Sequence, residues 1–140
     1  MPKYIMRKIA LDYGEKKIGI AYSDIMGIIA SGYDTLIRKS LHEDLEAIAN
    51  VIKEKQADTL VVGLPINMDG THGERVDKTH AFCEELKKVI NIPIVFIDER
   101  LTTVSAEKLL ISASVRREKR KTVIDKVAAM IILQSYLDKC

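Results

Sequence analysis

The 140-residue sequence has few cysteines and no long apolar segment, and each of these shortages excludes a class of protein. Its two cysteines, Cys83 and Cys140, cannot supply the framework of disulfides that stabilises small secreted domains. No apolar run reaches the roughly 18 residues that a membrane span needs, and the opening "MPKYIMRK" lacks the apolar core of a secretory signal. We therefore expect a cytoplasmic protein that does not bind a membrane.

The net charge is also small, at +2, so any electrostatic attraction to nucleic acid must be local. A zinc site has little support either: His80 and Cys83 stand three residues apart, but zinc takes about four ligands and no second pair follows. The composition, 47% hydrophobic and 30% charged, is that of a globular protein, and the chain contains no repeat or low-complexity linker. We expect residues 1–140 to form a single domain.

Five apolar segments of the sequence are candidate strands. The first three, near residues 7–12, 17–23 and 28–37, are separated by the short connections "YGEK" and "DIMG". A parallel crossover needs a dozen or more residues, so these connections predict an antiparallel meander. Two further buried strands are predicted at 59–63 and 92–98.

Helical periodicity fills most of the remaining sequence. A helix is expected over 40–55, where Ser40 and Glu43 form a capping-box pattern, and another over 73–90, between the two later strands. Strand, helix, strand makes a right-handed crossover with parallel strands. Further helices are expected near 103–113 and over 123–139. The order predicts an α/β fold with a mixed five-stranded sheet, three antiparallel strands then two parallel, flanked by helices; this is also the element order of the ribonuclease H-like fold.

Carboxylates stand at the ends of several predicted elements. Asp12 ends the first strand, Asp98 and Glu99 end the last, and Asp125 lies on the apolar face of the final helix. Ligands of open α/β sheets bind beyond the carboxyl ends of the strands, so these groups are expected to converge there. Neighbouring carboxylates repel one another and need a cation, and hard oxygen ligands suit Mg²⁺ or Mn²⁺. Such ions can drive phosphodiester hydrolysis.

Each of these carboxylates also has a simpler interpretation. Asp12 precedes Tyr-Gly and could be an ordinary turn residue. Asp125 could complete a capping box with Thr122 at the start of the helix, a role that does not exclude metal binding. The acidic pair at 98–99 could form an ion pair with Arg100. The convergence of three separate element ends is what favours a metal site.

Two segments could contact phosphates. The loop "GLPINMDGTHGER" at 63–75 contains Gly63 and Gly70, which allow close backbone approach, and it precedes a helix N-terminus suited to an anion. An ordinary long turn is the alternative. The run "RREKRK", expected as a charged loop, is either a phosphate-binding cluster or a solvated surface. Its cations are Arg116, Arg117, Lys119, Arg120 and Lys121.

Four segments in order, 9–24, 63–73, 98–103 and 124–137, together resemble the YqgF family. Its members are described as Holliday-junction-resolvase-like proteins and as the pre-16S ribosomal RNA nuclease. The resemblance spans nearly the whole chain. It implies a ribonuclease H-like fold, a cytoplasmic role in maturing the 5′ end of 16S ribosomal RNA, and hydrolysis of phosphodiesters that depends on a divalent metal.

The resemblance also assigns roles to residues. Asp12 matches the family's first-strand Asp, Glu99 the acidic residue of its D-E-R motif, and Asp125 the helix Asp before paired alanines; Asp98 remains an alternative ligand to Glu99. The substrate-binding residues that the motifs imply are Asn67, Arg100 and Thr103, beside the glycine loop.

Other functions stay open at this stage. The same ligands could cut a branched DNA junction, because nothing in these residues selects RNA over DNA. The protein could bind ribosomal RNA without cutting it. Actin-like ATPases share a D-x-G turn, but they need two such domains. The sequence fits a monomer or a homodimer.

Overall fold

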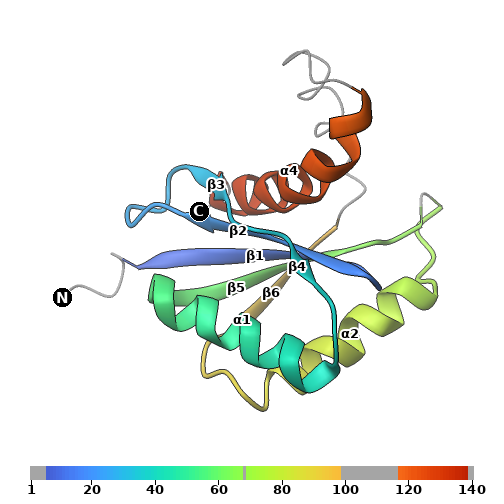
Figure 1. The fold of residues 1–140 in the computed structure, drawn as a ribbon, viewed down its shortest axis with the longest axis horizontal. Coiled ribbons are helices and arrows are strands. Elements are labelled where there is room, and N and C mark those ends of the chain that lie inside the picture. The colour runs from blue at the N-terminus through green and yellow to red at the C-terminus, as the bar shows by residue number, and fades with distance from the viewer. Residues whose placement is uncertain (1–5, 68, 99–116, 139–140) are drawn as a thin grey trace.

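The computed structural model describes residues 6–67, 69–98 and 117–138, which build a sheet with helices on both faces (Figure 1). The strand order is β3-β2-β1-β5-β6, with β4 also paired to β2. β1 runs antiparallel to β2 and parallel to β5, and β5 runs parallel to β6. The strands are β1 (Arg7–Tyr13), β2 (Lys17–Ser23), β3 (Ala30–Gly32), β4 (Leu36–Ile37), β5 (Ala57–Leu64) and β6 (Ile94–Asp98). The mixed α/β architecture is therefore confirmed.

The sheet has six strands rather than the five expected, because the segment predicted as one third strand forms two short ones. β3 and β4 both pair antiparallel with β2, at its two ends. Gly32 and Asp34, residue types that are depleted in strands, stand at the break between them. Between these two residues, the hydroxyl of Tyr33 donates a hydrogen bond of 2.8 Å to Glu54 of the helix that follows.

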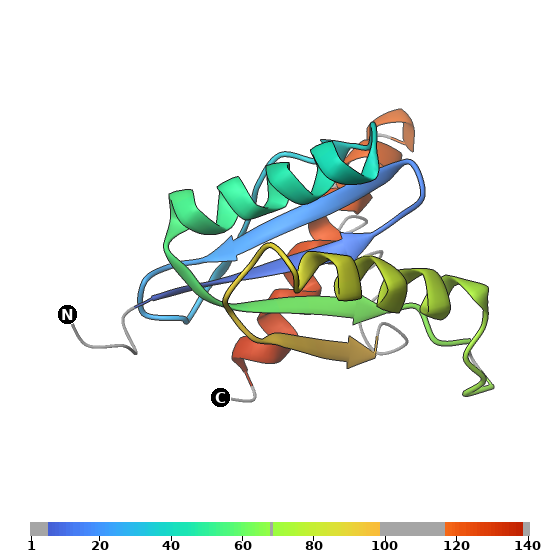
Figure 2. The same cartoon turned by 90° about the horizontal axis from the view of Figure 1, so that it is seen from below.

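Helices α1 (Leu41–Lys55) and α2 (Glu74–Leu86) cover one face of the sheet, and α4 (Arg117–Leu137) covers the other (Figures 1 and 2). Side chains alternate along each strand, so β1 and β5 contribute to two separate cores. The core beneath α1 and α2 includes Ile9, Leu11, Leu60, Val62, Ile48 and Phe82, and the core beneath α4 includes Ala10, Ala21, Val61, Ala129, Ile132 and Leu133. The alanines on both sides of the second interface allow α4 to lie close to the sheet.

The start of α1 follows the prediction. Ser40 is the N-cap, and its Oγ accepts a hydrogen bond of 3.2 Å from the backbone N–H of Glu43. α2 is shorter than the predicted helix over 73–90. Within the described ranges, no helix is both long and apolar enough to cross a membrane.

The start of α4 differs from the prediction. The helix begins at Arg117 rather than near residue 123, so most of the expected charged loop forms its first turns. Arginine, lysine and glutamate are good helix formers, and no glycine or proline interrupts the run. Thr122 is thus inside the helix, and the proposed capping box with Asp125 is wrong, since an N-cap must precede the first turn. The helix predicted near 103–113 lies outside the described residues.

Candidate functional site

The carboxyl ends of three parallel strands meet at one edge of the sheet (Figure 2). Leu11 of β1 is level with Val62 of β5, and Leu64 of β5 is level with Asp98 of β6. β1 is the central strand and ends one residue beyond Asp12. This edge is where open α/β sheets bind their ligands.

Asp12 and Asp98 reach this edge on opposite faces of the sheet. Asp12 is half-buried and shares the parity of Ala10, which lies in the core beneath α4. Asp98 shares the parity of Phe96, which packs against the core beneath α1 and α2, whereas Ile97 packs beneath α4. The two aspartates therefore lie at one edge but do not share a face.

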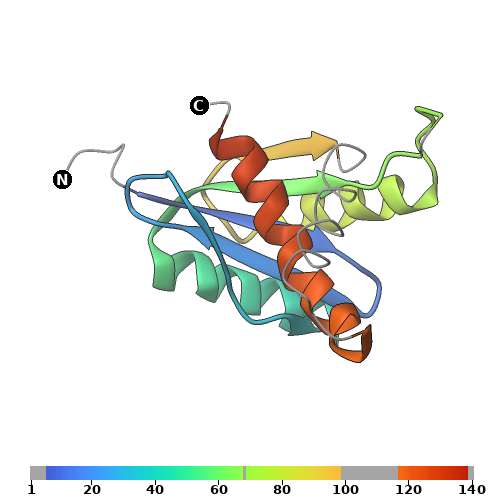
Figure 3. The same ribbon diagram turned by 90° about the horizontal axis from the view of Figure 1, so that it is seen from above.

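The position of residue 125 is on the sheet-facing side of α4. It stands four residues before Ala129 and seven before Ile132, both fully buried against the sheet. Figure 3 shows α4 crossing the sheet diagonally, with its N-terminal turns on the side where β1 turns into β2. The backbone thus places position 125 one turn from Ala129, toward the end of β1 that carries Asp12.

Glu99 and several predicted substrate contacts lie outside the residues that the structure describes. Its described parts contain no group of three or more His, Cys, Asp and Glu side chains placed to hold a metal. The predicted residues that lie outside the described residues are Glu99, Arg100, Thr103 and Arg116; for Arg117, Lys119, Arg120, Lys121 and Asp125 the backbone is described and the side chain is not.

The glycine-rich loop is a built structure held by its own side chains. Asn67 donates from Nδ2 to Thr71 Oγ1 at 3.0 Å, and its backbone carbonyl accepts from the N–H of Gly70 at 2.8 Å. Asp69 Oδ1 accepts from the backbone N–H and the hydroxyl of Thr71, at 2.9 and 2.6 Å. Gly70 has a φ of 89°, which explains a glycine there, whereas Gly63 lies within β5. The Asn67 amide nitrogen is thus engaged within the loop.

The N-terminus of α2 already carries negative charge. Its N-cap is Gly73, which makes no side-chain cap, and Glu74 and Asp77 lie in the first turn, where carboxylates complement the helix dipole. Lys78 forms ion pairs with Glu74 and with Glu15 of the β1–β2 turn, and its hydrogen bond lowers the pKa of the exposed Glu15 carboxyl. These acids oppose the phosphate that the sequence predicted at this helix end.

A polar network next to Asp12 was not foreseen. Arg38 donates from Nε to the buried Asp44 at 3.0 Å, and from Nη1 to the Tyr13 hydroxyl at 2.6 Å and the Gly14 carbonyl at 3.3 Å. Asp44 also accepts from the backbone N–H of Lys39. The network ties the segment before α1 to the end of β1. The one signal in the sequence was Asp44 itself, an acid on the apolar face of a helix.

The family follows from comparison with known proteins. The model of the RuvX family, described as "Holliday junction resolvase", matches residues 6–139. This chain belongs to the RuvX family. Nucleases of this kind generally use divalent metal ions, so membership of the RuvX family agrees with a metal-dependent reaction.

Two close relatives of this RuvX family chain carry the name "Putative pre-16S rRNA nuclease". The one from Halothermothrix orenii is 50% identical over 133 residues, covering 95% of each chain. The one from Caldanaerobacter subterraneus subsp. tengcongensis is 52% identical over 134 residues, covering 95% of this chain and 96% of the relative. The predicted family resemblance is confirmed.

Solved structures confirm the fold. RuvC of T. thermophilus in complex with a Holliday junction substrate has a TM-score of 0.59 at 10% identity, covering 94% of this chain and 96% of that one. The fowlpox virus Holliday junction resolvase has a TM-score of 0.56 at 13% identity, covering 96% and 100%. The RuvX family chain therefore has the ribonuclease H-like fold expected from its element order.

Proposed function

We propose that this protein is an endonuclease that hydrolyses phosphodiesters of structured RNA, with a divalent metal, in the maturation of the 5′ end of 16S ribosomal RNA. The observation that carries the proposal is about 50% identity, over 95% of the chain, to relatives named as pre-16S rRNA nucleases. The structure adds a carboxylate, Asp12, at the end of the central strand on the face that α4 crosses. The cytoplasm is the compartment that this function implies.

The donor set fits a hard divalent ion. Asp12 is half-buried beside the fully buried Ala10, and the backbone of α4 brings position 125 toward the same end of β1. Two carboxylates about 4 Å apart at such a place repel by roughly 4 kcal/mol at an effective dielectric of 20, and a cation removes that cost. Oxygen ligands of this kind favour Mg²⁺ or Mn²⁺. We propose that Asp12, Glu99 and Asp125 hold the ion.

Glu99 is preferred to Asp98 because Asp98 has the parity of the opposite face. When bound, the metal supplies Lewis-acid activation at the phosphodiester. The residues of the chain fix its position: Asp12 extends from the central strand of the sheet, whose neighbours on both sides hold the backbone by hydrogen bonds. Small displacements of a catalytic group lower the reaction rate strongly, so a rigid strand is a suitable support for Asp12.

The basic turns of α4 would bind the phosphates of the substrate. Positions 117, 121 and 125 are spaced four apart in one continuous helix, so they follow one line along its surface. The cations at positions 117 and 121 would bind the phosphates of a nucleic acid strand and so place that strand near position 125. The remaining substrate contacts that we propose are Gly63, Asn67, Gly70, Arg100, Thr103, Arg116, Lys119 and Arg120.

A second candidate is cleavage of four-way DNA junctions, which the description of the RuvX family as a Holliday junction resolvase favours. Carboxylates and a metal bind the phosphate, which RNA and DNA share. Only a contact to the 2′-hydroxyl would distinguish RNA from DNA. The test is a titration of Mg²⁺ and Mn²⁺ against a 5′-extended 16S precursor fragment and a DNA junction. We expect metal-dependent cleavage of the RNA. Cleavage of the junction alone would favour the second candidate, and binding without cleavage under either ion would overturn both.

A further inference from the structure

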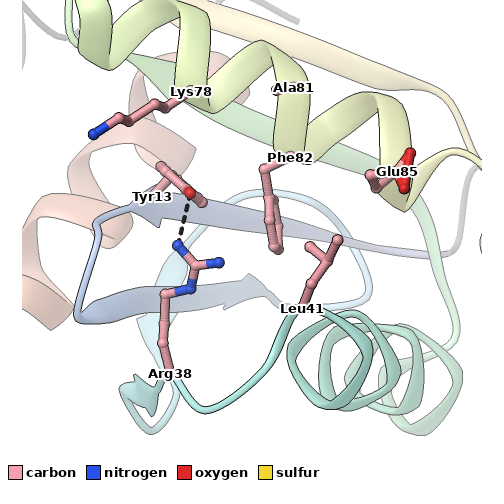
Figure 4. A pocket seen from close by; sticks show the side chains of 7 residues that line it. All are labelled: Tyr13, Arg38, Leu41, Lys78, Ala81, Phe82 and Glu85. Atoms are coloured by element: carbon pink, nitrogen blue, oxygen red, sulfur yellow. Dashed lines mark hydrogen bonds between the residues drawn. The ribbon is translucent and has the colours of Figure 1, made fainter.

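We propose that a pocket beside Tyr13, on the face of the sheet opposite Asp12, binds one unstacked base of the RNA. The identity of this ligand rests on the proposed function. The pocket has a volume of about 240 Å³ and lies between the end of β1, the start of α1 and the side of α2 that faces them (Figure 4). Its walls include Tyr13, Arg38, Leu41, Ala81 and Phe82.

The walls contain groups of the kind on which unpaired bases stack, and because Phe82 is only 4% exposed, Arg38 and Tyr13 are the groups that a base would contact. The rings of Tyr13 and Phe82 are 4.9 Å apart between centroids, and the Arg38 guanidinium lies over both, at 4.9 and 5.3 Å. Leu41 is 44% exposed at the opposite wall, an apolar surface that a base would cover. Aromatic rings and arginine planes are the usual partners of splayed RNA bases.

Arg38 also supplies a hydrogen-bond donor. Its Nε and Nη1 are engaged by Asp44, Tyr13 and the Gly14 carbonyl, which fix the guanidinium in place. Figure 4 shows the second terminal nitrogen directed away from Tyr13, toward Phe82 and Leu41. It makes no hydrogen bond to the other side chains drawn in Figure 4. A ring nitrogen or carbonyl of a base could accept this bond.

The charges around the pocket favour the base over a phosphate. Lys78 at its mouth is paired with Glu15 and Glu74, and Glu85 at the other end is paired with Lys88. Positive and negative groups therefore nearly balance, and a phosphate would gain little there. The base of a nucleotide carries no charge and therefore suits such a pocket. The sugar and the phosphate would remain outside it.

The pocket lies at the end of β1, the strand that carries Asp12. A smaller cleft lined by Gly14 and Arg75 shares Tyr13 and Lys78 with it, and leads past the β1–β2 turn to the first turn of α2. Tyr13 follows Asp12 directly in β1, and consecutive Cα atoms are only about 3.8 Å apart. Because the two side chains leave opposite faces of the sheet, a nucleic acid strand held at Asp12 would pass around the end of β1 to place a base in this pocket.

The test fills the pocket without touching the metal site. Ala81 is exposed on α2, so Ala81→Trp adds a ring at the pocket without disturbing the core. Asn50→Trp, on the exposed side of α1, adds the same side chain elsewhere and serves as the control. The probe is a short single-stranded oligoribonucleotide, intact or with one abasic residue at each position in turn. Its affinity is measured by fluorescence anisotropy in EDTA, where cleavage does not contribute.

We expect one abasic position to lower the affinity of the wild type about tenfold, the size of a lost base-stacking contact. Ala81→Trp should bind the intact probe about tenfold more weakly and lose this dependence on the abasic position, while Asn50→Trp behaves as the wild type. The proposal is overturned if Ala81→Trp keeps the wild-type affinity and abasic profile, or if the wild type shows no abasic effect or no binding. Failure of the nuclease function would show separately, as absent cleavage with metal.

Discussion

Asp44 is a buried charge whose partners are two adjacent residues just before α1, Arg38 and Lys39. Its side chain is 2% exposed and that of Arg38 is 18% exposed, so each charge is largely removed from water and depends on the other. Through Arg38 the pair also holds the Tyr13 hydroxyl, next to Asp12. Residues 38 and 13 stand far apart in sequence, and no local pattern joins them; only folding brings them together.

Removing one partner of this pair should destabilise the protein. We expect Asp44→Ala to lower the free energy of unfolding by about 3 kcal/mol, because it leaves the arginine without its buried counter-ion. Urea denaturation measures this. Glu46→Ala is the matched control on the same helix, since its contact with His42 is exposed and should contribute less than about 0.5 kcal/mol. Equal losses in the two variants would contradict this account of Asp44.

Cys83 should give a pH dependence at the alkaline end. Burial raises the pKa of its thiol from 9.0 to about 12, so the folded state favours the protonated thiol. The resulting stability is complete below pH 9 and is lost as the pH rises from about 9 to 12, because the unfolded chain releases the proton first. We expect the free energy of unfolding to fall over this range less steeply in Cys83→Ala than in the wild type. Parallel pH profiles would show that the thiol is not responsible.

At the scale of elements, the β1–β2 hairpin depends on one glycine. A Cβ added at Gly14 would lie 2.5 Å from the backbone carbonyl of Lys17, closer than such atoms approach in proteins. We expect Gly14→Ala to cost about 1–3 kcal/mol in the free energy of unfolding, the range of overpacked substitutions. Chemical denaturation tests this, and an unchanged midpoint would mean that the hairpin relaxes freely.

The early start of α4 can be tested with proline. Glu118 lies in the first turn, where proline is tolerated, whereas Thr122 lies inside the helix. We expect Thr122→Pro to cost about 3 kcal/mol and Glu118→Pro much less, as measured by urea denaturation. If the helix instead began near residue 123, the two substitutions would have similar, small effects.

The elements show which features a sequence can predict. The cap of α1 and the hairpin of β1 and β2 were predicted because their signals are local: Ser40 three residues before Glu43, and a connection too short for a crossover. The start of α4 was missed because charged residues favour a solvated loop by composition and a helix by propensity. The sequence alone could not show that Asp12 and Asp98 lie on opposite faces of the sheet, because this depends on the register of the strands.

At the scale of the whole molecule, the two cores share one sheet. β1 and β5 each contribute alternate residues to both, so loss of either core should disturb the other. We therefore predict that residues 1–140 unfold as a single domain, with equal calorimetric and van't Hoff enthalpies. A calorimetric enthalpy well above the van't Hoff value would indicate separate units and contradict the single-domain prediction.

The central claim is that Asp12 holds the catalytic metal, and a pair of matched substitutions tests it most directly. Asp12 and Asp98 end neighbouring parts of one sheet edge, but on opposite faces. The measurement is the rate of Mn²⁺-dependent cleavage of a 5′-extended 16S precursor fragment. Asp12→Asn should lower it by at least about 100-fold, the upper end of what losing a supporting group around a metal costs, while Asp98→Asn stays close to the wild type. Full activity in Asp12→Asn would contradict the claim.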